Sequence, residues 1–579
     1  MKEEFGARVW LVLGAFGFFA LMVLARLFFI QTSTEAEAFR AQASENEYQI
    51  VYIYPPRGEI LDRNGHLLAG NELTYEVSVD LSAVNDPQTL ASALSSTLNL
   101  PYDQVYAHLL HPSPGKTYWM VKDFVPKEQA QALEKLEEQF LQSGKPLPSL
   151  RGLTLREHLA RSYPEKDLAS NVLGFVNREN RGYFGIEEKY NDLLAGRPLA
   201  VKVPTNPLQA VDMPRVPAGT TLILSLDRTL QALMERLADQ ALEEYGAKRV
   251  VIVVMAPRSG EILAMASTSR MDLNQFWNYP VLYKQAVDFN PAISYAYEPG
   301  SLIKIFPMSA ALEVGLVTPQ TSYFDTGSIL IGGRYIYNWN GAAWGQQDMV
   351  GCLRHSLNVC LAWVAAQLGA PRFYEFMDRF GFGRPTGIDL AGEAAGRLKR
   401  PGDGDWYPID LGTNAFGQGI AVTPVQMLMA ASALANEGQM VVPHLLVAME
   451  RDGRRYTLPP QYAGRPISPQ TAQTISWMLT ASLEGEDSAA QVPGYRIAGK
   501  TGTAQIPTPL GYTSDRTNTS FIGWGPVDDP QFMIYVWLEE PSTSIWASET
   551  AAPLFAQAAE RVILHLKIPP DSLRVAGNR

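Results

Sequence analysis

The sequence is poor in cysteine, in histidine and in net positive charge. Only two cysteines and seven histidines occur among 579 residues, which excludes a disulfide framework and a thiolate zinc cluster. Acidic residues outnumber basic ones by 59 to 48, and the net charge is −11, so the chain lacks the charge of a nucleic-acid-binding protein. The HExxH motif of zinc proteases and the GxSxG motif of α/β-hydrolases are also missing. We therefore expect no metal, no cofactor and no nucleic-acid partner.

Long hydrophobic runs are absent too, with one exception near the N-terminus. Residues 9–30 are apolar except for Arg26, and a helix of this length can cross a bilayer. A cleaved signal peptide is the alternative, because Ala36 and Ala38 have the spacing of a cleavage site, but its apolar region usually has only about 7–15 residues. We predict an uncleaved anchor at 9–30, a short cytoplasmic tail at 1–8 and an extracytoplasmic location for the rest.

Prolines divide the remaining chain into two parts. Four prolines lie between residues 204 and 217, and such a stretch is typical of a domain boundary. Extended segments and two helical stretches precede it. We predict a non-catalytic domain at 31–215, a second domain at 216–570 and a C-terminal tail at 571–579.

The second domain has the pattern of an antiparallel sheet covered by helices. A helix capped by Asp227 should precede two buried strands, RVVIVVMAP and EILAMAS. Three more strands are expected in RIAGKTGTAQI, SFIGWGP and FMIYVWLEE, before a last helix at 552–566. Strands at both ends with helices between them predict one α+β domain, with the sheet sandwiched by helices.

One familiar motif conflicts with its surroundings. Residues 494–501, GYRIAGKT, match the GxxxxGK[ST] phosphate-binding loop. That loop needs a helix beginning at its Lys-Thr pair, whereas here the chain continues as GTAQIPTP. We interpret Lys500, Thr501, Gly502 and Thr503 as part of a strand, in which Gly502 permits close approach of a ligand.

A KTG strand is one of three elements in a group of serine enzymes, and the other two, SxxK and SxN, are also present. SLIK contains Ser301 and Lys304, and SLN contains Ser356 and Asn358. A second SxxK begins at Ser113, but the proline and glycine inside it prevent its side chains from sharing a helical face. SLIK instead opens an apolar stretch, and on a helix its serine and lysine are neighbours at i and i+3.

The three elements together have the groups that nucleophilic catalysis needs. Ser301 attacks only if a base takes its proton, and burial with the cation Lys500 nearby would lower the pKa of Lys304 enough for this task. The amides of Ser301 and Thr503 could form an oxyanion hole. The structural alternative is a neutralised buried Lys304 with Ser301 as a helix cap; Pro307 has no explanation in the predicted helix. Ser356 could relay a proton, and Asn358 could bind a substrate amide. A terminal carboxylate of the substrate would suit Lys500, Thr501 and Thr503.

These motifs, with RGEILDRNG at 57–65, RSYP at 161–164, GYFGIE at 182–187 and FGQGIAVTPVQ at 416–426, resemble class B penicillin-binding proteins over nearly the whole chain. The resemblance implies a type II anchor in the cell membrane, an extended pedestal domain and a C-terminal transpeptidase domain. It implies that Ser301 attacks the penultimate D-alanine of a peptidoglycan stem peptide, releases D-alanine and passes the acyl group to an amine. Penicillins would acylate Ser301 as inhibitors.

By position in the motifs, the resemblance makes Lys304 the base and Ser356, Asn358 and Lys500 supporting groups. It also implies a polytopic glycan polymerase of the SEDS type (FtsW- or RodA-like) as partner. Members act in cell division or elongation, and FGQGIAVTPVQ favours division. A carboxypeptidase or penicillin-degrading hydrolase of the same fold, and a non-catalytic penicillin sensor or scaffold, are the alternatives.

Two further features have two interpretations each. The motif at 57–65 contains a ready hairpin turn at Asn64-Gly65, and we favour a structural role over organising the pedestal or docking a partner. Cys352 and Cys360 would lie about 12 Å apart on one helix, too far for a disulfide, whereas an intervening loop would permit one. We favour two small buried residues without a bridge. In the motif at 57–65, both interpretations concern Arg57, Gly58, Asp62, Arg63, Asn64 and Gly65.

Overall fold

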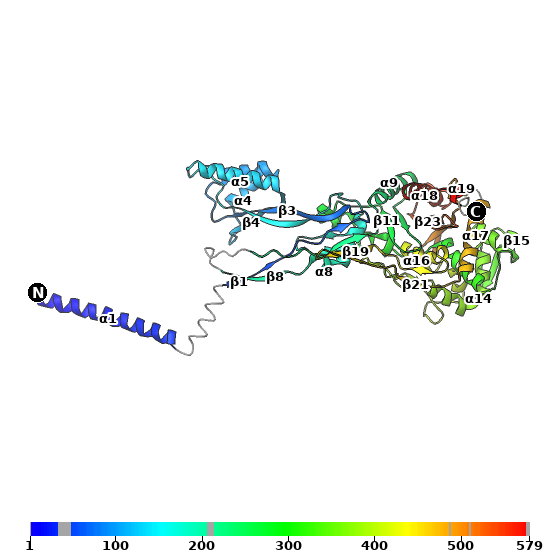
Figure 1. The fold of residues 1–579 in the computed structure, drawn as a ribbon, viewed down its shortest axis with the longest axis horizontal. Coiled ribbons are helices and arrows are strands. Elements are labelled where there is room, and N and C mark those ends of the chain that lie inside the picture. The colour runs from blue at the N-terminus through cyan, green and yellow to red at the C-terminus, as the bar shows by residue number, and fades with distance from the viewer. Residues whose placement is uncertain (1, 33–47, 205–212, 486–487, 509–510, 575–579) are drawn as a thin grey trace. The chain divides into compact units, whose positions relative to one another are not determined.

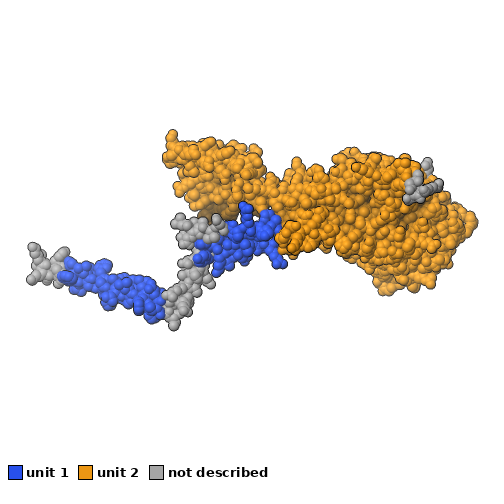
Figure 2. Space-filling model, viewed as in Figure 1, with its two compact units in different colours: residues 1–56, 196–218 blue, residues 57–195, 219–579 orange. Residues whose placement is uncertain are grey.

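The chain forms two compact units in the computed structural model, shown in two colours in Figure 2. Unit 1 consists of residues 1–56 and 196–218, and unit 2 of residues 57–195 and 219–579. The structure describes residues 2–32, 48–204, 213–485, 488–508 and 511–574.

Unit 1 contains one long helix and one two-stranded ribbon. Helix α1 (Lys2–Thr32) includes the predicted span, and its segment Val9–Thr32 has a mean hydropathy of 2.3 with exposed side chains. Among the described residues it is the one helix long and apolar enough to cross a membrane. Strands β1 (Tyr48–Ile53) and β8 (Leu199–Pro204) pair antiparallel. The alternative cleavage site at Ala36 and Ala38 lies outside the described residues.

Unit 2 begins with a seven-stranded sheet on which three helices pack. Its strands are β2 (Ile60–Leu61), β3 (Leu67–Asp80), β4 (Tyr118–Pro126), β5 (Leu153–Ser162), β9 (Thr221–Leu224), β19 (Leu446–Arg451) and β20 (Arg454–Thr457), in the order β20-β19-β9-β2-β3-β4 with β5 also on β3. The helices are α3 (Pro87–Leu98), α4 (Tyr102–Leu110) and α5 (Lys127–Gln142). Two helical stretches were expected; the first is divided because Asn99 takes a left-handed backbone and Pro101 follows it.

The predicted five-stranded antiparallel sheet is confirmed. Its order is β11-β10-β24-β23-β22, so the two predicted groups of strands meet at β10 and β24. The edge strand β22 carries the KTG residues. The strands are β10 (Arg249–Met255), β11 (Ile262–Ser267), β22 (Ala498–Thr508), β23 (Gly511–Gly525) and β24 (Phe532–Glu539).

Alternating side chains of this sheet enter two separate hydrophobic cores, as a sheet covered on both faces requires. Val250 and Ile252 pack with helices α9 (Arg228–Tyr245) and α18 (Ala551–Leu566), which lie beside each other in Figure 1. Val251 and Val253 join the core that contains α12 (Ile305–Glu313), α16 (Pro424–Ala435) and α17 (Pro469–Gly485). Asp227 caps α9 as predicted, because its carboxylate accepts from the amides of Thr229 and Leu230.

Shorter elements complete unit 2 and form part of the cleft described below. The 3₁₀ helices are η2 (Leu273–Asn278), η3 (Ala286–Asp288) and η4 (Gly300–Lys304). The helices are α6 (Ser170–Leu173), α7 (Gly185–Lys189), α8 (Asn191–Ala195), α10 (Tyr279–Leu282), α11 (Pro291–Ser294), α13 (Met349–Arg354), α14 (Asn358–Arg379), α15 (Asp410–Asn414) and α19 (Asp571–Arg574). The strands are β6 (Phe175–Val176), β7 (Gly182–Tyr183), β12 (Tyr323–Asp325), β13 (Ser328–Ile331), β14 (Arg334–Tyr337), β15 (Gly345–Gln347), β16 (Arg397–Leu398), β17 (Ile420–Ala421), β18 (Met440–Val441) and β21 (Tyr462–Gly464).

Candidate active site

Ser301 and Lys304 lie on the 3₁₀ helix η4, immediately before α12. An α-helix was expected from Ser301 onward, and this expectation is wrong for its first turn. In a 3₁₀ helix, side chains at i and i+3 are directly aligned. The side chains of Ser301 and Lys304 therefore point in more nearly the same direction than they would on an α-helix. The 3₁₀ turn also explains Pro307, which becomes the third residue of α12, where a backbone N–H has no intrahelical acceptor.

The amine of Lys304 connects the SxxK and SxN motifs. Its Nζ is 2.9 Å from Ser301 Oγ, 3.0 Å from Ser356 Oγ and 2.8 Å from Asn358 Oδ1. It also donates to the backbone oxygen of Ser356 at 2.5 Å. The structure thus brings together four of the predicted residues around one buried nitrogen.

Lys304 is fully buried, and this changes its acid–base behaviour. Burial, and secondly the positive charge of Lys500, hold the pKa of Lys304 well below its ordinary value of 10.5. Both causes were anticipated from the sequence, because each disfavours the charged form of a lysine. An amine with a lowered pKa can accept a proton from the hydroxyl that touches it.

The SxN residues lie in a short loop between α13 and α14. Ser356 has a positive φ of 51°, and Asn358 is the first residue of α14. A disulfide joins Cys352 on α13 to Cys360 on α14, with 6.1 Å between the Cα atoms. The favoured interpretation of two unbridged cysteines is therefore wrong, because residues 355–357 interrupt the helix and fold the two ends together.

Strand β22 forms the other wall of the site. Lys500 is 4% exposed, and its Nζ donates to the backbone oxygen and Oγ1 of Thr501, both at 3.2 Å. Thr503 Oγ1 accepts from the amide of Ala547 at 3.1 Å. The strand continues to Thr508, so no helix follows the Lys-Thr pair and the phosphate-loop interpretation is excluded.

Two glycines let backbones touch beneath these groups, and a third lets β22 lie against a leucine side chain. A Cβ on Gly417 would lie 2.0 Å from the carbonyl oxygen of Gly300, and one on Gly300 would lie 2.5 Å from that of Thr503. A Cβ on Gly502 would lie 2.6 Å from Leu302 Cγ. The turn before Ser301, the 417–419 loop and strand β22 are therefore packed too closely for any side chain.

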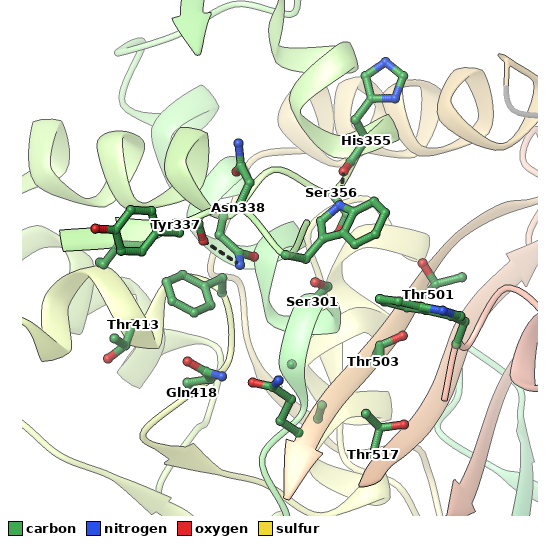
Figure 3. A pocket seen from close by; sticks show the side chains of 18 of the residues that line it. Ser301, Tyr337, Asn338, His355, Ser356, Thr413, Gln418, Thr501, Thr503 and Thr517 are labelled. Atoms are coloured by element: carbon green, nitrogen blue, oxygen red, sulfur yellow. Dashed lines mark hydrogen bonds between the residues drawn. The ribbon is translucent and has the colours of Figure 1, made fainter. Parts of the chain in front are cut away.

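A cleft with a volume of about 790 Å³ opens in front of the two walls within unit 2. In Figure 3, Ser301 is central, with Ser356 above it, Thr501 and Thr503 to one side, and Tyr337 and Thr413 to the other. Ser301, Ser356, Asn358, Thr501 and Thr503 line the cleft, whereas Lys304, Lys500 and Gly502 lie behind its surface.

The sequence interpretation missed several residues that line the cleft. Gln418 is one, although FGQG was recognised as a motif; the alternating aromatics of RYIYNW were a signal that went unused. Glu298, which does not line the cleft, was also missed: its Oε1 accepts from the Gly419 amide at 2.9 Å and from the Tyr512 hydroxyl at 3.1 Å. The other missed lining residues include Tyr335, Tyr337, Trp339, Thr413 and Trp546.

The motif at 57–65 does not line the cleft. Arg57 and Arg161 donate to the two carboxylate oxygens of Glu187 at 2.7 and 2.6 Å, and all three side chains are almost completely buried. Gly58 lies against the backbone of Thr220, where an added Cβ would be 2.0 Å from the carbonyl oxygen. This half of the motif joins segments distant in sequence within unit 2.

The second half of the motif forms a turn that contacts helix α9. Asp62 Oδ1 accepts from the amides of Asn64 and His66, both at 2.8 Å, and Gly65 has a φ of 85°. Asn64 Nδ2 donates to Asp227, the cap of α9, at 3.2 Å. Arg63 is more exposed and lies 3.4 Å from Glu261. Within the described ranges, no three His, Cys, Asp or Glu side chains are grouped to hold a metal ion.

Two family descriptions match the sequence. The penicillin binding protein transpeptidase domain matches residues 250–560, and the penicillin-binding protein dimerisation domain matches residues 52–209. The chain is 31% identical over 566 residues to stage V sporulation protein D of Bacillus subtilis, covering 95% of this chain and 84% of that protein. It is 27% identical to peptidoglycan D,D-transpeptidase FtsI of Escherichia coli, covering 89% and 85%.

The fold is similar to solved structures as well. Penicillin-binding protein 3 of Mycobacterium tuberculosis, crystallised in complex with aztreonam, superposes with a TM-score of 0.68 at 27% sequence identity. The similarity covers 90% of this chain and 98% of that one.

Proposed function

The chain belongs to the class B penicillin-binding proteins and is a D-Ala-D-Ala transpeptidase of peptidoglycan, and from this premise we propose that Ser301 is its nucleophile. Ser301 Oγ attacks the carbonyl of the penultimate D-alanine of a stem peptide and forms an ester. The bond to the terminal D-alanine breaks, and that D-alanine leaves. The observation that carries the proposal is the 2.9 Å contact between Ser301 Oγ and the buried amine of Lys304.

Lys304 is the general base of this step. Its lowered pKa provides a neutral amine that takes the Ser301 proton. Ser356 Oγ, 3.0 Å from the same Nζ, relays the proton to the leaving amine of D-alanine. The amides of Ser301 and Thr503 stabilise the oxyanion that develops on the attacked carbonyl.

The remaining predicted residues bind the donor peptide. Asn358 holds a substrate amide, and its own Oδ1 accepts from Lys304 at 2.8 Å. Thr501 and Thr503 offer hydroxyls at the cleft surface to the terminal carboxylate, and the charge of Lys500 lies behind them. Gly502 acts from behind the surface: because it has no side chain, β22 can lie against Leu302, which keeps Thr501 and Thr503 beside the donor peptide. Penicillins acylate Ser301 in place of the donor.

A covalent label tests the nucleophile. The wild-type chain should bind a fluorescent penicillin that survives denaturing gel electrophoresis, and Ser301→Ala should lose the label. Ser113→Ala is the matched control, because Ser113 begins the second SxxK sequence on an exposed turn, and it should label like the wild type. Label on Ser301→Ala would refute the assignment.

Helix α1 is proposed to anchor the protein in the cell membrane as a type II protein, with residues 1–8 in the cytoplasm. The Cys352–Cys360 disulfide supports an extracytoplasmic location for unit 2, because disulfides persist in oxidising compartments. We assign residues 31–215 to the pedestal and residues 216–570 to the transpeptidase domain. Protease added to intact spheroplasts should digest unit 2. If unit 2 were protected, the topology would be the reverse of the proposed one.

A polytopic glycan polymerase of the SEDS type (FtsW- or RodA-like) is the proposed partner, in cell division or elongation. A transpeptidase needs glycan strands to join, and a membrane anchor would keep it beside the enzyme that makes them. Co-purification from detergent-solubilised membranes with each polymerase tests the pairing. Recovery of neither would contradict it.

A further inference from the structure

The hairpin β13–β14 presents a rigid edge at the mouth of the cleft. Its strands are joined by Gly332-Gly333, and both glycines have positive φ, as a tight two-residue turn requires. One face is anchored, because Ile336 is 5% exposed and packs with Ala362 of α14 and with Phe416. The hairpin therefore has a fixed position relative to helix α14.

The opposite face of the hairpin carries large aromatic side chains that remain exposed. Tyr335, Tyr337 and Trp339 alternate along the chain and are 61%, 58% and 52% exposed, and all three line the cleft. The ring centroids of Tyr335 and Tyr337 are 6.3 Å apart. Contiguous exposed aromatics on a rigid support mark a binding surface. We call these three residues the aromatic rim.

Hydrogen bonds tie the aromatic rim and the intervening Asn338 to residues 355–359. Asn358 Nδ2 donates to the carbonyl of Tyr337 at 3.2 Å, and Trp339 Nε1 donates to the carbonyl of His355 at 3.3 Å. Asn338, between them, is buried and accepts from the amide of Val359 at 3.2 Å. These bonds fix the position of the rim relative to Asn358 and, because Asn358 Oδ1 accepts from Lys304, relative to Lys304 as well.

Tyr337 lies across Ser301 from the hydroxyls proposed to hold the donor's terminal carboxylate, whereas Trp339 extends toward that wall, with its ring centroid 5.1 Å from that of Trp546. Figure 3 shows Tyr337 on one side of Ser301 and the hydroxyls of Thr501 and Thr503 on the other. A transpeptidase must bind a second substrate that supplies the attacking amine, and we take this amine to sit on an aliphatic side chain. Aromatic faces suit such a group, since they pack against its methylenes and attract its ammonium form. Arg334, exposed at the start of β14 and lining the cleft, suits a carboxylate of the same peptide.

We propose that Tyr335, Tyr337 and Trp339, with Arg334, bind the acceptor stem peptide. The inference rests on the proposed acyl-enzyme on Ser301. In the transfer step, the neutral acceptor amine attacks the ester carbonyl and forms a C–N bond. The C–O bond to Ser301 Oγ breaks, and the proton lost by the amine passes through Lys304 to that oxygen. Water that attacks instead gives the hydrolysed peptide.

The partition between transfer and hydrolysis measures acceptor binding separately from acylation. The full chain in detergent is given a donor peptide ending in D-Ala-D-Ala and an acceptor tetrapeptide with a free side-chain amine. Tyr335→Ala/Tyr337→Ala should lower the ratio of cross-linked to hydrolysed product about tenfold at subsaturating acceptor, the loss expected for two aromatic contacts to a cation. The rate of acylation by fluorescent penicillin should fall much less than this ratio.

Three comparisons make the test decisive. Tyr335→Phe/Tyr337→Phe keeps the aromatic faces and should restore most of the ratio. Tyr456→Ala removes an equally exposed tyrosine of β20, outside the cleft, and should change neither reading. An acceptor whose amine is acetylated should give no cross-link with any variant.

Two results would overturn the inference. One is an unchanged ratio in Tyr335→Ala/Tyr337→Ala, and the other is an equal fall in acylation and in transfer. Failure of the proposed nucleophile looks different, because the wild type would then form no penicillin adduct on Ser301 at all.

Discussion

The pKa of Lys304 sets the pH range in which a single residue can act as base. Burial and the charge of Lys500 keep this pKa well below 10.5. Below the pKa the amine is protonated and cannot take the proton of Ser301, so acylation should decline as the pH falls through it. The acidic limb of the pH–rate profile therefore reports the environment of Lys304.

Lys500→Ala tests this link. Removal of the nearby cation raises the pKa of Lys304, so the acidic limb of penicillin acylation should move to higher pH, whatever the loss in maximal rate. Lys500→Arg keeps the charge and should leave the limb in place. A limb that does not move in Lys500→Ala would show that Lys304 is not the titrating base.

Glu187 is the other residue on which much depends, since its single carboxylate pairs with two buried guanidinium groups. Glu187→Gln leaves Arg57 and Arg161 with an uncompensated buried charge and should lower the free energy of unfolding by about 3–5 kcal/mol. Urea denaturation followed by tryptophan fluorescence measures the change. Asp405→Asn breaks the exposed pair with Arg397 and should cost less than about 1 kcal/mol; equal losses would argue against the buried network.

Among the elements, the SxN loop depends on a covalent constraint. Cys352→Ser/Cys360→Ser releases a short loop between α13 and α14, and loop entropy alone predicts a loss of about 2–3 kcal/mol in stability. Acylation should slow severalfold without being abolished, because Ser356 and Asn358 lose part of their positioning. The wild type treated with a reductant should match the double variant in both measurements. Unchanged acylation would show that the loop holds its conformation without the bridge.

Elements with a strong local signal were predictable from the sequence. Five strands, the cap at Asp227 and the SxxK, SxN and KTG motifs each rest on apolar runs or on fixed spacing, and the structure contains the strands, the cap and the clustered motif residues. The 3₁₀ turn at Ser301 was not predictable, because its apolar pattern equals that of an α-helix. The disulfide was not predictable either, because it requires a loop in which Ser356 adopts a positive φ. A serine in the sequence does not indicate such a backbone conformation.

The aromatic rim shows a different limit of sequence interpretation. Tyr335, Tyr337 and Trp339 alternate as in any half-buried strand. Only the packing of Ile336 with Ala362 of α14 and with Phe416 decides that Ile336 is buried and that the aromatic side chains are exposed.

At the scale of the whole molecule, the residues of the cleft all belong to unit 2, and helix α1 belongs to unit 1. A chain that begins at Tyr48 lacks α1 and should remain in the supernatant when membranes are sedimented. It should be acylated by penicillin at the rate of the full-length chain, since no cleft residue has been removed. A marked loss of acylation would show that the first 47 residues are needed to form the site.

The glycine contacts beneath the cleft also limit how the enzyme could acquire drug resistance. Gly300, Gly417 and Gly502 leave no space for even one methyl group, so a variant cannot exclude an antibiotic by building inward from this floor without displacing Ser301. Substitutions that tell an antibiotic from a stem peptide must therefore arise on the walls, where side chains already face solvent. Selection with penicillins should enrich changes there and leave the three glycines untouched.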